Sequence, residues 1–296
     1  MLPCQLPPPL QPGDRLWVMN PSGTLREETA FQRGVQIWAE RGYEVILSPG
    51  VYDRWGYLAG TDEDRRLQLE TGLKDPAIQG ILCGRGGYGG ARLLENWHWP
   101  GVPPKWLIGF SDVTSLLWSY ANEGVAGVHG PVLTTLAAEP DWSVNRLFDL
   151  VEGRPLEPLS GTGWGKGQAE GLLLPANLTV ATHLLGTLLQ PDLTGVILAL
   201  EDVSEAPYRI DRTLTQWRMA GFLEHLRGIA LGRFSDCQAP AGIPSFTVAE
   251  VLRDRLGDLN LPIVSDLPFG HQGANAALPV GVPACLDAVT GTLSLL

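Results

Sequence analysis

Short apolar runs alternate with amphipathic segments over the first 122 residues, and this alternation restricts the fold more than any other feature of the sequence. Runs of aliphatic and β-branched residues are typical of buried strands, whereas apolar residues three or four apart among charges indicate helices. Strands are predicted at 15–19, 43–47, 79–83 and 106–109, and helices at 25–42, 61–74, 90–97 and 112–122. Because such alternation builds βαβ units, a mostly parallel sheet is expected.

The pattern becomes more mixed after about residue 135. Residues 153–168 are rich in Gly, Pro and Ser, which favours a linker. Beyond it, helices are predicted at 177–187, 207–220 and 247–256, strands at 194–201, 228–233 and 262–265, and a hairpin over 284–295. We therefore expect an α/β protein with an N-terminal domain built on the mostly parallel sheet (12–152), a linker (153–168) and a mixed α/β C-terminal domain (169–296).

The charge balance excludes several classes of protein. Lys and Arg total 21 against 32 Asp and Glu, a net charge of −11, which argues against nucleic-acid binding through basic patches and against a polybasic membrane-surface protein. The longest apolar stretch, 171–189, is interrupted by polar residues, and the proline-rich N-terminus lacks the features of a secretory signal. A cytoplasmic protein without a membrane span is expected.

The cysteines and histidines predict neither a metal site nor a cofactor. The four cysteines form no C-x-x-C pair, and no H-E-x-x-H motif occurs. Cys83 ends one apolar run and Cys285 lies in another, so both are expected to be buried thiols.

A glycine-rich loop follows the third predicted strand. Residues 84–89 fit G-x-G-x-x-G, and Asp112 lies 23 residues further on, as in a dinucleotide-binding fingerprint. That fingerprint belongs to the first βα turn, however, and its acidic residue ends the next strand. Two other interpretations remain open: a loop whose backbone approaches a ligand and directs N–H groups at a developing anion, or a purely structural turn.

Ser111 is the candidate nucleophile. It follows a predicted strand and Gly109 and precedes a helix, so it is expected at the carboxyl edge of the sheet, although Val113 breaks the G-x-S-x-G elbow pattern. The competing interpretation is a helix N-cap.

A nucleophilic serine needs a base, and the base needs an orienting acid. His271 follows a predicted strand in an exposed loop, and His129 is its competitor. Glu201 ends the apolar strand 195–200, whereas Glu205 lies further along the turn.

Five segments together resemble the LD-carboxypeptidase family, serine peptidases that act on murein peptides and include the microcin-immunity peptidase as a relative. In family order they are Asn20-Pro21-Ser22-Gly23, Arg85-Gly86-Gly87-Tyr88-Gly89, Gly109-Phe110-Ser111-Asp112-Val113-Thr114, Leu200-Glu201-Asp202-Val203 with Tyr208-Arg209-Ile210-Asp211-Arg212, and Phe269-Gly270-His271. Each is weak alone, but five in order over about residues 14–290 are specific. One departure is Leu174-Pro175-Ala176-Asn177, where relatives usually have glycine before the Asn; Pro175 puts the substrate contacts of this loop in doubt.

The resemblance implies a serine carboxypeptidase of the muramoyltetrapeptide type. It implies Ser111 as nucleophile, His271 as general base and then acid, and Glu201 as orienting carboxylate, and it prefers them to His129 and Glu205. The backbone N–H groups of Gly87 and Asp112 are expected to form the oxyanion hole. The family also implies a Rossmann-like N-terminal domain that carries Ser111, a C-terminal domain with β-structure that carries Glu201 and His271, and a homodimer.

The expected reaction removes terminal D-alanine from murein tetrapeptides during wall recycling, at the bond to an L-centre diamino acid. Arg85, beside the glycine loop, is the candidate for binding the substrate carboxylate. The alternatives are a related serine amidase acting on a peptidyl-nucleotide or another amide, and a nucleotide-binding dehydrogenase or binding protein that uses the glycine loop.

Overall fold

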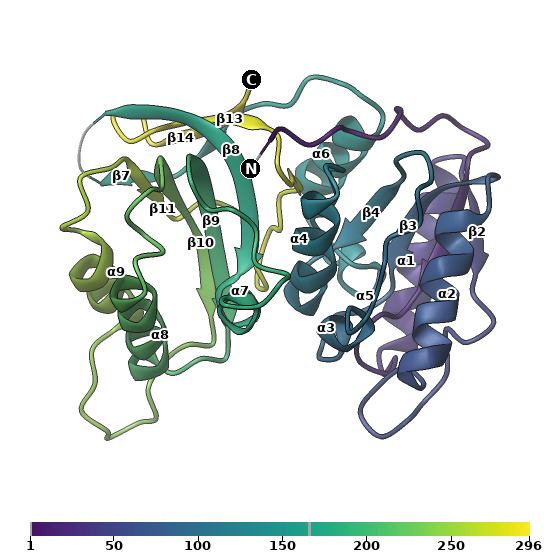
Figure 1. The fold of residues 1–296 in the computed structure, drawn as a ribbon, viewed down its shortest axis with the longest axis horizontal. Helices are drawn as coiled ribbons and strands as arrows, with labels where there is room; N and C mark the ends of the chain where they lie inside the picture. The colour runs from purple at the N-terminus through teal and green to yellow at the C-terminus, as the bar shows by residue number, and fades with distance from the viewer. Residues whose placement is uncertain (1, 165–166) are drawn as a thin grey trace.

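The computed structural model describes residues 2–164 and 167–296, which form two sheets lying side by side (Figure 1). The first sheet has the order β12-β5-β4-β3-β1-β2. Its members are β1 (Arg15–Met19), β2 (Glu44–Leu47), β3 (Ile78–Cys83), β4 (Trp106–Gly109), β5 (Val128–His129) and β12 (Leu278–Pro279). The strands β1 to β5 are parallel, as predicted, and β12 joins β5 antiparallel.

Helices cover both faces of the first sheet. Trp38 and Phe148 pack with Leu16 and Val18 on one face, whereas Leu69 packs on the other. The first face carries α1 (Glu28–Glu40), α5 (Leu133–Leu136) and α6 (Asp141–Val151); the opposite face carries α2 (Asp62–Lys74), α3 (Gly90–Leu93) and α4 (Thr114–Asn122). This two-sided burial explains the nearly continuous apolar runs in the strands.

The second sheet is mixed and has the order β6-β14-β13-β8-β9-β10-β11-β7. Its parallel centre is β8 (Gln168–Asn177), β9 (Val196–Val203), β10 (Gly228–Ser235) and β11 (Ile263–Ser265). Antiparallel strands flank it, namely β6 (Leu159–Ser160), β7 (Thr162–Trp164), β13 (Pro283–Asp287) and β14 (Thr292–Leu295). The helices α7 (Leu178–Leu184), α8 (Pro207–Met219) and α9 (Val248–Leu256) pack on one face. The mixed second half with β-structure is thus confirmed.

The helices α4 and α7 lie between the two sheets (Figure 1). Trp118 of α4 donates from Nε1 to the Pro175 carbonyl at 3.0 Å, and the Asn177 N–H donates to Thr114 Oγ1 at 3.0 Å. One buried apolar cluster includes side chains from both halves, Trp118 and Trp217 among them. The two sheets are therefore joined by a shared core.

Several elements differ from the sequence predictions. The helix predicted at 90–97 is α3, which ends at Leu93, and neither β8 nor α6 was predicted. The strands β6 and β7 lie within 153–168, the stretch expected to be a linker, and residues 165 and 166 of that stretch lie outside the described residues. The division into domains at 152 and 169 stays a prediction.

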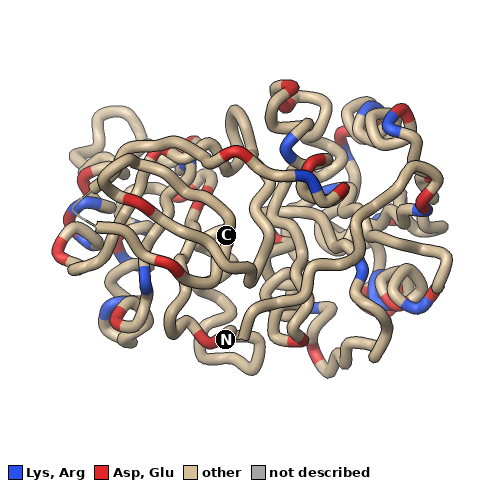
Figure 2. Tube along the Cα trace, turned by 90° about the horizontal axis from the view of Figure 1, so that it is seen from above, with Lys and Arg blue, Asp and Glu red and all other residues tan. Residues whose placement is uncertain are grey.

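Charged residues are scattered over both halves of the molecule (Figure 2). In the part of the chain that the structure describes, no helix is long and apolar enough to cross a membrane. Cys83 and Cys285 are buried as free thiols, which confirms the prediction for both.

Candidate active site

Ser111 lies on a sharp turn between β4 and the one-turn 3-10 helix η1 (Ser111–Val113). Its φ of 64° is in the left-handed region, which a serine adopts only under strain. The turn needs Gly109, because a Cβ there would lie 3.0 Å from the side chains of Cys83 and Val113. Phe110 is the N-cap of η1, so the alternative interpretation of Ser111 as a helix N-cap is wrong.

The glycine-rich loop packs directly against this turn. A Cβ at Gly86 would lie 3.1 Å from Ser111 Cβ and 3.2 Å from its Oγ. Gly87 has a φ of 117°, and Gly23 supports the loop from behind by donating its N–H to the Gly86 carbonyl at 3.1 Å. The following helix, α3, has only four residues. The loop therefore serves the serine turn and does not open the long helix that a dinucleotide pyrophosphate would need.

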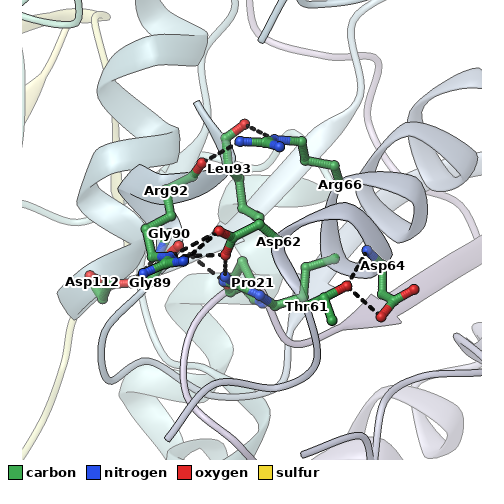
Figure 3. A network of polar contacts seen from close by, with 11 residues as sticks. Pro21, Thr61, Asp62, Asp64, Arg66, Gly89, Gly90, Arg92, Leu93 and Asp112 are labelled. Atoms are coloured by element: carbon green, nitrogen blue, oxygen red, sulfur yellow. Dashed lines mark hydrogen bonds and ion pairs between the residues drawn. The ribbon is translucent and has the colours of Figure 1, made fainter. Parts of the chain in front are cut away.

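A network of charges anchors the far end of the glycine loop (Figure 3). Arg65, whose side chain is completely buried, donates to the carbonyl oxygens of Gly89, at 3.0 Å, and Pro21, and it pairs with Asp62. Arg92 also pairs with Asp62, at 2.6 Å. The helix α2 thus fixes the segment that carries Gly87 and the segment that carries Gly23 in position relative to each other.

Asp112 links the serine turn to the same loop. Its carboxylate accepts a hydrogen bond from the Gly90 N–H at 2.7 Å, and only 4% of the residue is exposed (Figure 3). Burial raises the pKa of this carboxyl group above its usual range. The Asp112 backbone N–H belongs to the first turn of η1, where it has no carbonyl of the same helix to bond.

His271 and Glu201 lie close together near the carboxyl ends of the parallel strands of the second sheet. His271 Nδ1 lies 2.6 Å from Glu201 Oε2; the glutamate is fully buried at the end of β9, and the histidine side chain is 18% exposed. Gly270 permits this approach, since its φ is 120° and a Cβ would lie 3.2 Å from the Glu201 Cβ. The contact engages Nδ1, so Nε2 is the nitrogen left to exchange a proton with a substrate or a nucleophile.

One cavity of about 390 Å³ brings the two halves of the site together. Ser111, His271 and Gly87 all line it, and the Phe110 ring packs 4.8 Å from the His271 ring, centroid to centroid. No hydrogen bond is present between Ser111 Oγ and His271 in residues 2–164 and 167–296. Serine and histidine thus share a cavity without a hydrogen bond between them, and hydrogen bonds of catalytic pairs in ligand-free enzymes are often long or poorly aligned.

His129 is buried elsewhere. It is fully inaccessible, packs on Phe110 and Phe269, and does not line the cavity that holds Ser111. Burial lowers the pKa of His129 to about 3, so the ring stays neutral at ordinary pH. Glu205, the competitor of Glu201, pairs with Arg209 at 3.5 Å instead.

Arg85 also lines the cavity, but it is already paired. Its Nε lies 3.0 Å from Glu27 Oε2, and Glu27 is a further cavity residue that the sequence analysis did not identify. Burial opposes ionisation of Glu27, but the guanidinium outweighs it and lowers the pKa of this carboxyl. Among the described residues, no group of three or more His, Cys, Asp or Glu is arranged to hold a metal ion.

Comparison with known proteins identifies the family. The family model of the LD-carboxypeptidase N-terminal domain matches residues 17–130, and that of the C-terminal domain matches residues 170–286. The chain belongs to the LD-carboxypeptidase family. It is 62% identical over 98% of its length to a protein of Synechocystis sp. provisionally named a carboxypeptidase, covering 97% of that protein. It is 34% identical over 83% of its length to the murein tetrapeptide carboxypeptidase of Pseudomonas aeruginosa, covering 84% of that enzyme.

Solved structures agree with this assignment. A muramoyltetrapeptide carboxypeptidase from Oxalobacter formigenes superimposes with a TM-score of 0.81 at 28% identity, over 95% of this chain and 97% of that chain. The microcin immunity protein MccF shares the fold, with a TM-score of 0.86 at 21% identity over 98% of each chain. The chain is therefore an enzyme of the carboxypeptidase class, and its fold is that of its relatives.

Asn177 supports the buried glutamate in this LD-carboxypeptidase family member. Its Nδ2 donates to Glu201 Oε1 at 3.2 Å and to Asp202 Oδ1 at 3.0 Å, while its Oδ1 caps α7 by accepting from the Val180 N–H. The sequence analysis singled out this segment only for Pro175. The available signal was an Asn at a strand-to-helix junction, where N-caps are common.

Proposed function

We propose that this enzyme is a serine-type LD-carboxypeptidase with Ser111 as nucleophile, His271 as general base and then acid, and Glu201 as the orienting carboxylate. The observation that carries the proposal is the 2.6 Å contact between His271 Nδ1 and the fully buried Glu201, in a histidine that shares a cavity with Ser111. A carboxylate at Nδ1 fixes the tautomer in which Nε2 can accept a proton, and it stabilises the imidazolium that results.

The reaction balances with these groups alone. Ser111 Oγ attacks the carbonyl of the L-centre that carries the terminal D-residue, and its proton passes to His271 Nε2. His271 then protonates the leaving nitrogen, the C–N bond breaks, and D-alanine departs. Water attacks the acyl-enzyme with His271 again as base, which regenerates Ser111 and releases the shortened peptide.

The oxyanion of the tetrahedral intermediate would be bound by the backbone N–H groups of Gly87 and Asp112. Two features support this: the loop runs so close to the serine that a Cβ at Gly86 would lie 3.2 Å from Ser111 Oγ, and Asp112 lies in the first turn of η1. Loss of one such donor typically costs about 10²–10³ in rate. Arg85 would bind the free carboxylate of the substrate and exchange part of its contact with Glu27 for it.

The substrate proposal is a murein tetrapeptide ending in D-alanine. It is supported by the name of the Pseudomonas aeruginosa relative and by the Oxalobacter formigenes structure. The test is release of free D-alanine from a purified muropeptide, with Ser111→Ala as the inactive variant and Ser119→Ala, on α4 and outside the cavity, as the control serine. We expect release by the native enzyme and by the control, and a loss of at least 10³-fold in Ser111→Ala.

Two outcomes would contradict the proposal. D-alanine release by the Ser111→Ala variant would show that Ser111 is not the nucleophile. Cleavage of an aminoacyl sulfamoyl nucleoside, the type of ligand bound to MccF, without cleavage of the muropeptide would instead favour the amidase alternative.

The remaining expectations are also proposals. Trimming of recycled murein peptides in the cytoplasm and a homodimeric state are carried by the family resemblance, and sedimentation velocity tests the second. The assignment of Ser111 to an N-terminal domain and of Glu201 and His271 to a C-terminal domain is supported by the two separate family matches.

A further inference from the structure

We propose that Glu139 is a positioning residue for His271: it clamps the loop that carries the proposed base to the half of the protein that carries Ser111. This inference rests on the proposed triad. Glu139 lies between α5 and α6, in the N-terminal half, and is 132 residues before His271 in the chain. It touches neither Ser111 nor the cavity wall, so its effect on the reaction would be indirect.

The clamp is a chain of two hydrogen bonds. Glu139 Oε2 accepts the backbone N–H of Asn275 at 2.7 Å. Asn275, only 1% exposed, turns its Oδ1 back to accept the backbone N–H of Gly270 at 3.0 Å. Gly270 is the residue immediately before His271, so each bond in the chain lies closer to the imidazole.

Other contacts tie the same loop to the second sheet. The Ala276 N–H donates to the Pro268 carbonyl at 2.9 Å, Arg233 donates to the Ala274 carbonyl, and the Gln272 N–H donates to Ser235 Oγ at 3.2 Å. These bonds fix the loop shape and its distance from Glu201. The Glu139 bond crosses to the half of the protein in which β4 places Ser111. It lies nearer to His271 along the chain than the other hydrogen bonds that cross there, from Arg146 to the Ala277 carbonyl at 3.1 Å and between β5 and β12.

The consequence concerns the separation of base and nucleophile. Glu201 orients the imidazole, but it belongs to the second sheet, as does the loop. The contacts between Glu201 and this loop therefore do not set the distance between His271 Nε2 and Ser111 Oγ. Displacement of a catalytic group by about 1 Å can cost 10²-fold in rate, so a bond that holds the loop toward the serine turn is well placed to matter. A second partner, Ser143 Oγ at 2.8 Å, holds the Glu139 carboxylate in place.

The test uses the full-length enzyme and a fluorophosphonate probe, which reports serine activation without any murein substrate. Glu139→Ala is expected to lower the second-order rate of Ser111 phosphonylation, and kcat for D-alanine release, by about 30–100-fold, with KM changed less than threefold. Glu139→Gln keeps an oxygen that can accept the Asn275 N–H and is expected to recover the rate to within about tenfold of the native enzyme. Glu123→Ala, which removes an exposed glutamate of the same half that does not line the cavity, is the matched control and is expected to stay within twofold.

A purely structural role would lower the urea midpoint of Glu139→Ala but leave its phosphonylation rate within threefold of the native rate, and this result would overturn the proposal. So would a Gln variant as slow as the Ala variant. If Glu139→Ala does not fold, Asn275→Ala cuts the same chain at its second bond and is expected to show the same loss; a native rate there would equally refute the clamp. A native enzyme that reacts with the probe but releases no D-alanine would refute the substrate and leave the clamp testable, whereas an unreactive native enzyme would overturn both triad and clamp.

Discussion

Replacement of Glu201 by Gln tests how the buried acid acts, because the change removes a charge and almost no volume. Glu201 has two contacts to keep: Oε2 faces His271 Nδ1 at 2.6 Å, and Oε1 faces the Asn177 Nδ2 donor at 3.2 Å. A glutamine can satisfy Asn177 only by directing its oxygen there. Its NH2 group then faces His271 and donates to Nδ1, which forces the Nε2–H tautomer, and this tautomer cannot accept the Ser111 proton.

The opposite amide orientation is costly. It places two NH2 groups against each other at a buried position, and an unsatisfied buried donor costs about 1–3 kcal/mol. The productive tautomer would therefore be a minor state, and the imidazolium would also lose its counter-charge. Comparable changes in serine proteases lower kcat by about 10⁴, which corresponds to about 5 kcal/mol of transition-state stabilisation. We expect a loss of about 10³–10⁴ for Glu201→Gln.

The assay is the initial rate of D-alanine release together with the rate of fluorophosphonate labelling, since the second isolates serine activation. Glu205→Gln, in the same turn and paired with Arg209, is the control and should remain within threefold of the native rate. A Glu201→Gln enzyme that is folded and retains more than a tenth of native kcat would refute the tautomer argument.

Other changes probe the parts around this pair. Arg65→Met should lower the free energy of unfolding by about 3 kcal/mol, because two buried carbonyl oxygens lose their donor. A decrease of less than about 1 kcal/mol in the unfolding free energy from urea titration would contradict this. Glu27→Gln should lower KM severalfold by freeing Arg85 for the substrate carboxylate; a raised KM would instead indicate that Glu27 binds an ammonium group. His129 has its pKa lowered to about 3, so the native enzyme should lose up to about 1.4 kcal/mol of stability per pH unit as pH falls from 6.5 toward 3; His129→Phe should remove this slope in urea titrations, and an unchanged slope would refute it. Ser111→Gly should be about 1 kcal/mol more stable than Ser111→Ala, since only glycine adopts a φ of 64° without strain; equal stabilities would show no strain.

Local patterns predicted the first sheet well, and the reason is physical. Its inner strands β3 and β4 are almost completely buried, so each is a nearly unbroken apolar run, and the helix α1 buries one face. The second half was harder to predict. The strand β8 begins with exposed and half-buried residues, Gln168 to Leu172, and only its later residues are buried, so no single period marks it.

The same distinction holds at the site. Ser111, Glu201 and His271 became candidates because each follows a predicted strand, which is where α/β sheets carry polar ligand-binding groups, and the family resemblance then preferred them to His129 and Glu205. Asn177 and Glu27 were not predicted, because their roles depend on contacts 24 and 58 residues apart in sequence, with Glu201 and Arg85. Such contacts follow from how the sheets and loops pack, and a pattern within one segment does not encode them.

Two groups of the candidate site are unfavourable in free energy by themselves, and hydrogen bonds from neighbouring residues offset this. A non-glycine residue in the left-handed region costs about 1–3 kcal/mol, and a fully buried carboxylate is unfavourable unless it is hydrogen-bonded. Ser111 carries the first cost and Glu201 the second. The serine turn is held by the Gly90 bond to Asp112, and the glutamate is held by Asn177 and His271. Each costly group thus has its support in its own half of the protein, so each half can be preorganised by itself. Only the distance between Ser111 and His271 depends on how the halves meet, and a bond across that boundary is therefore where a small change in geometry has the largest effect on rate.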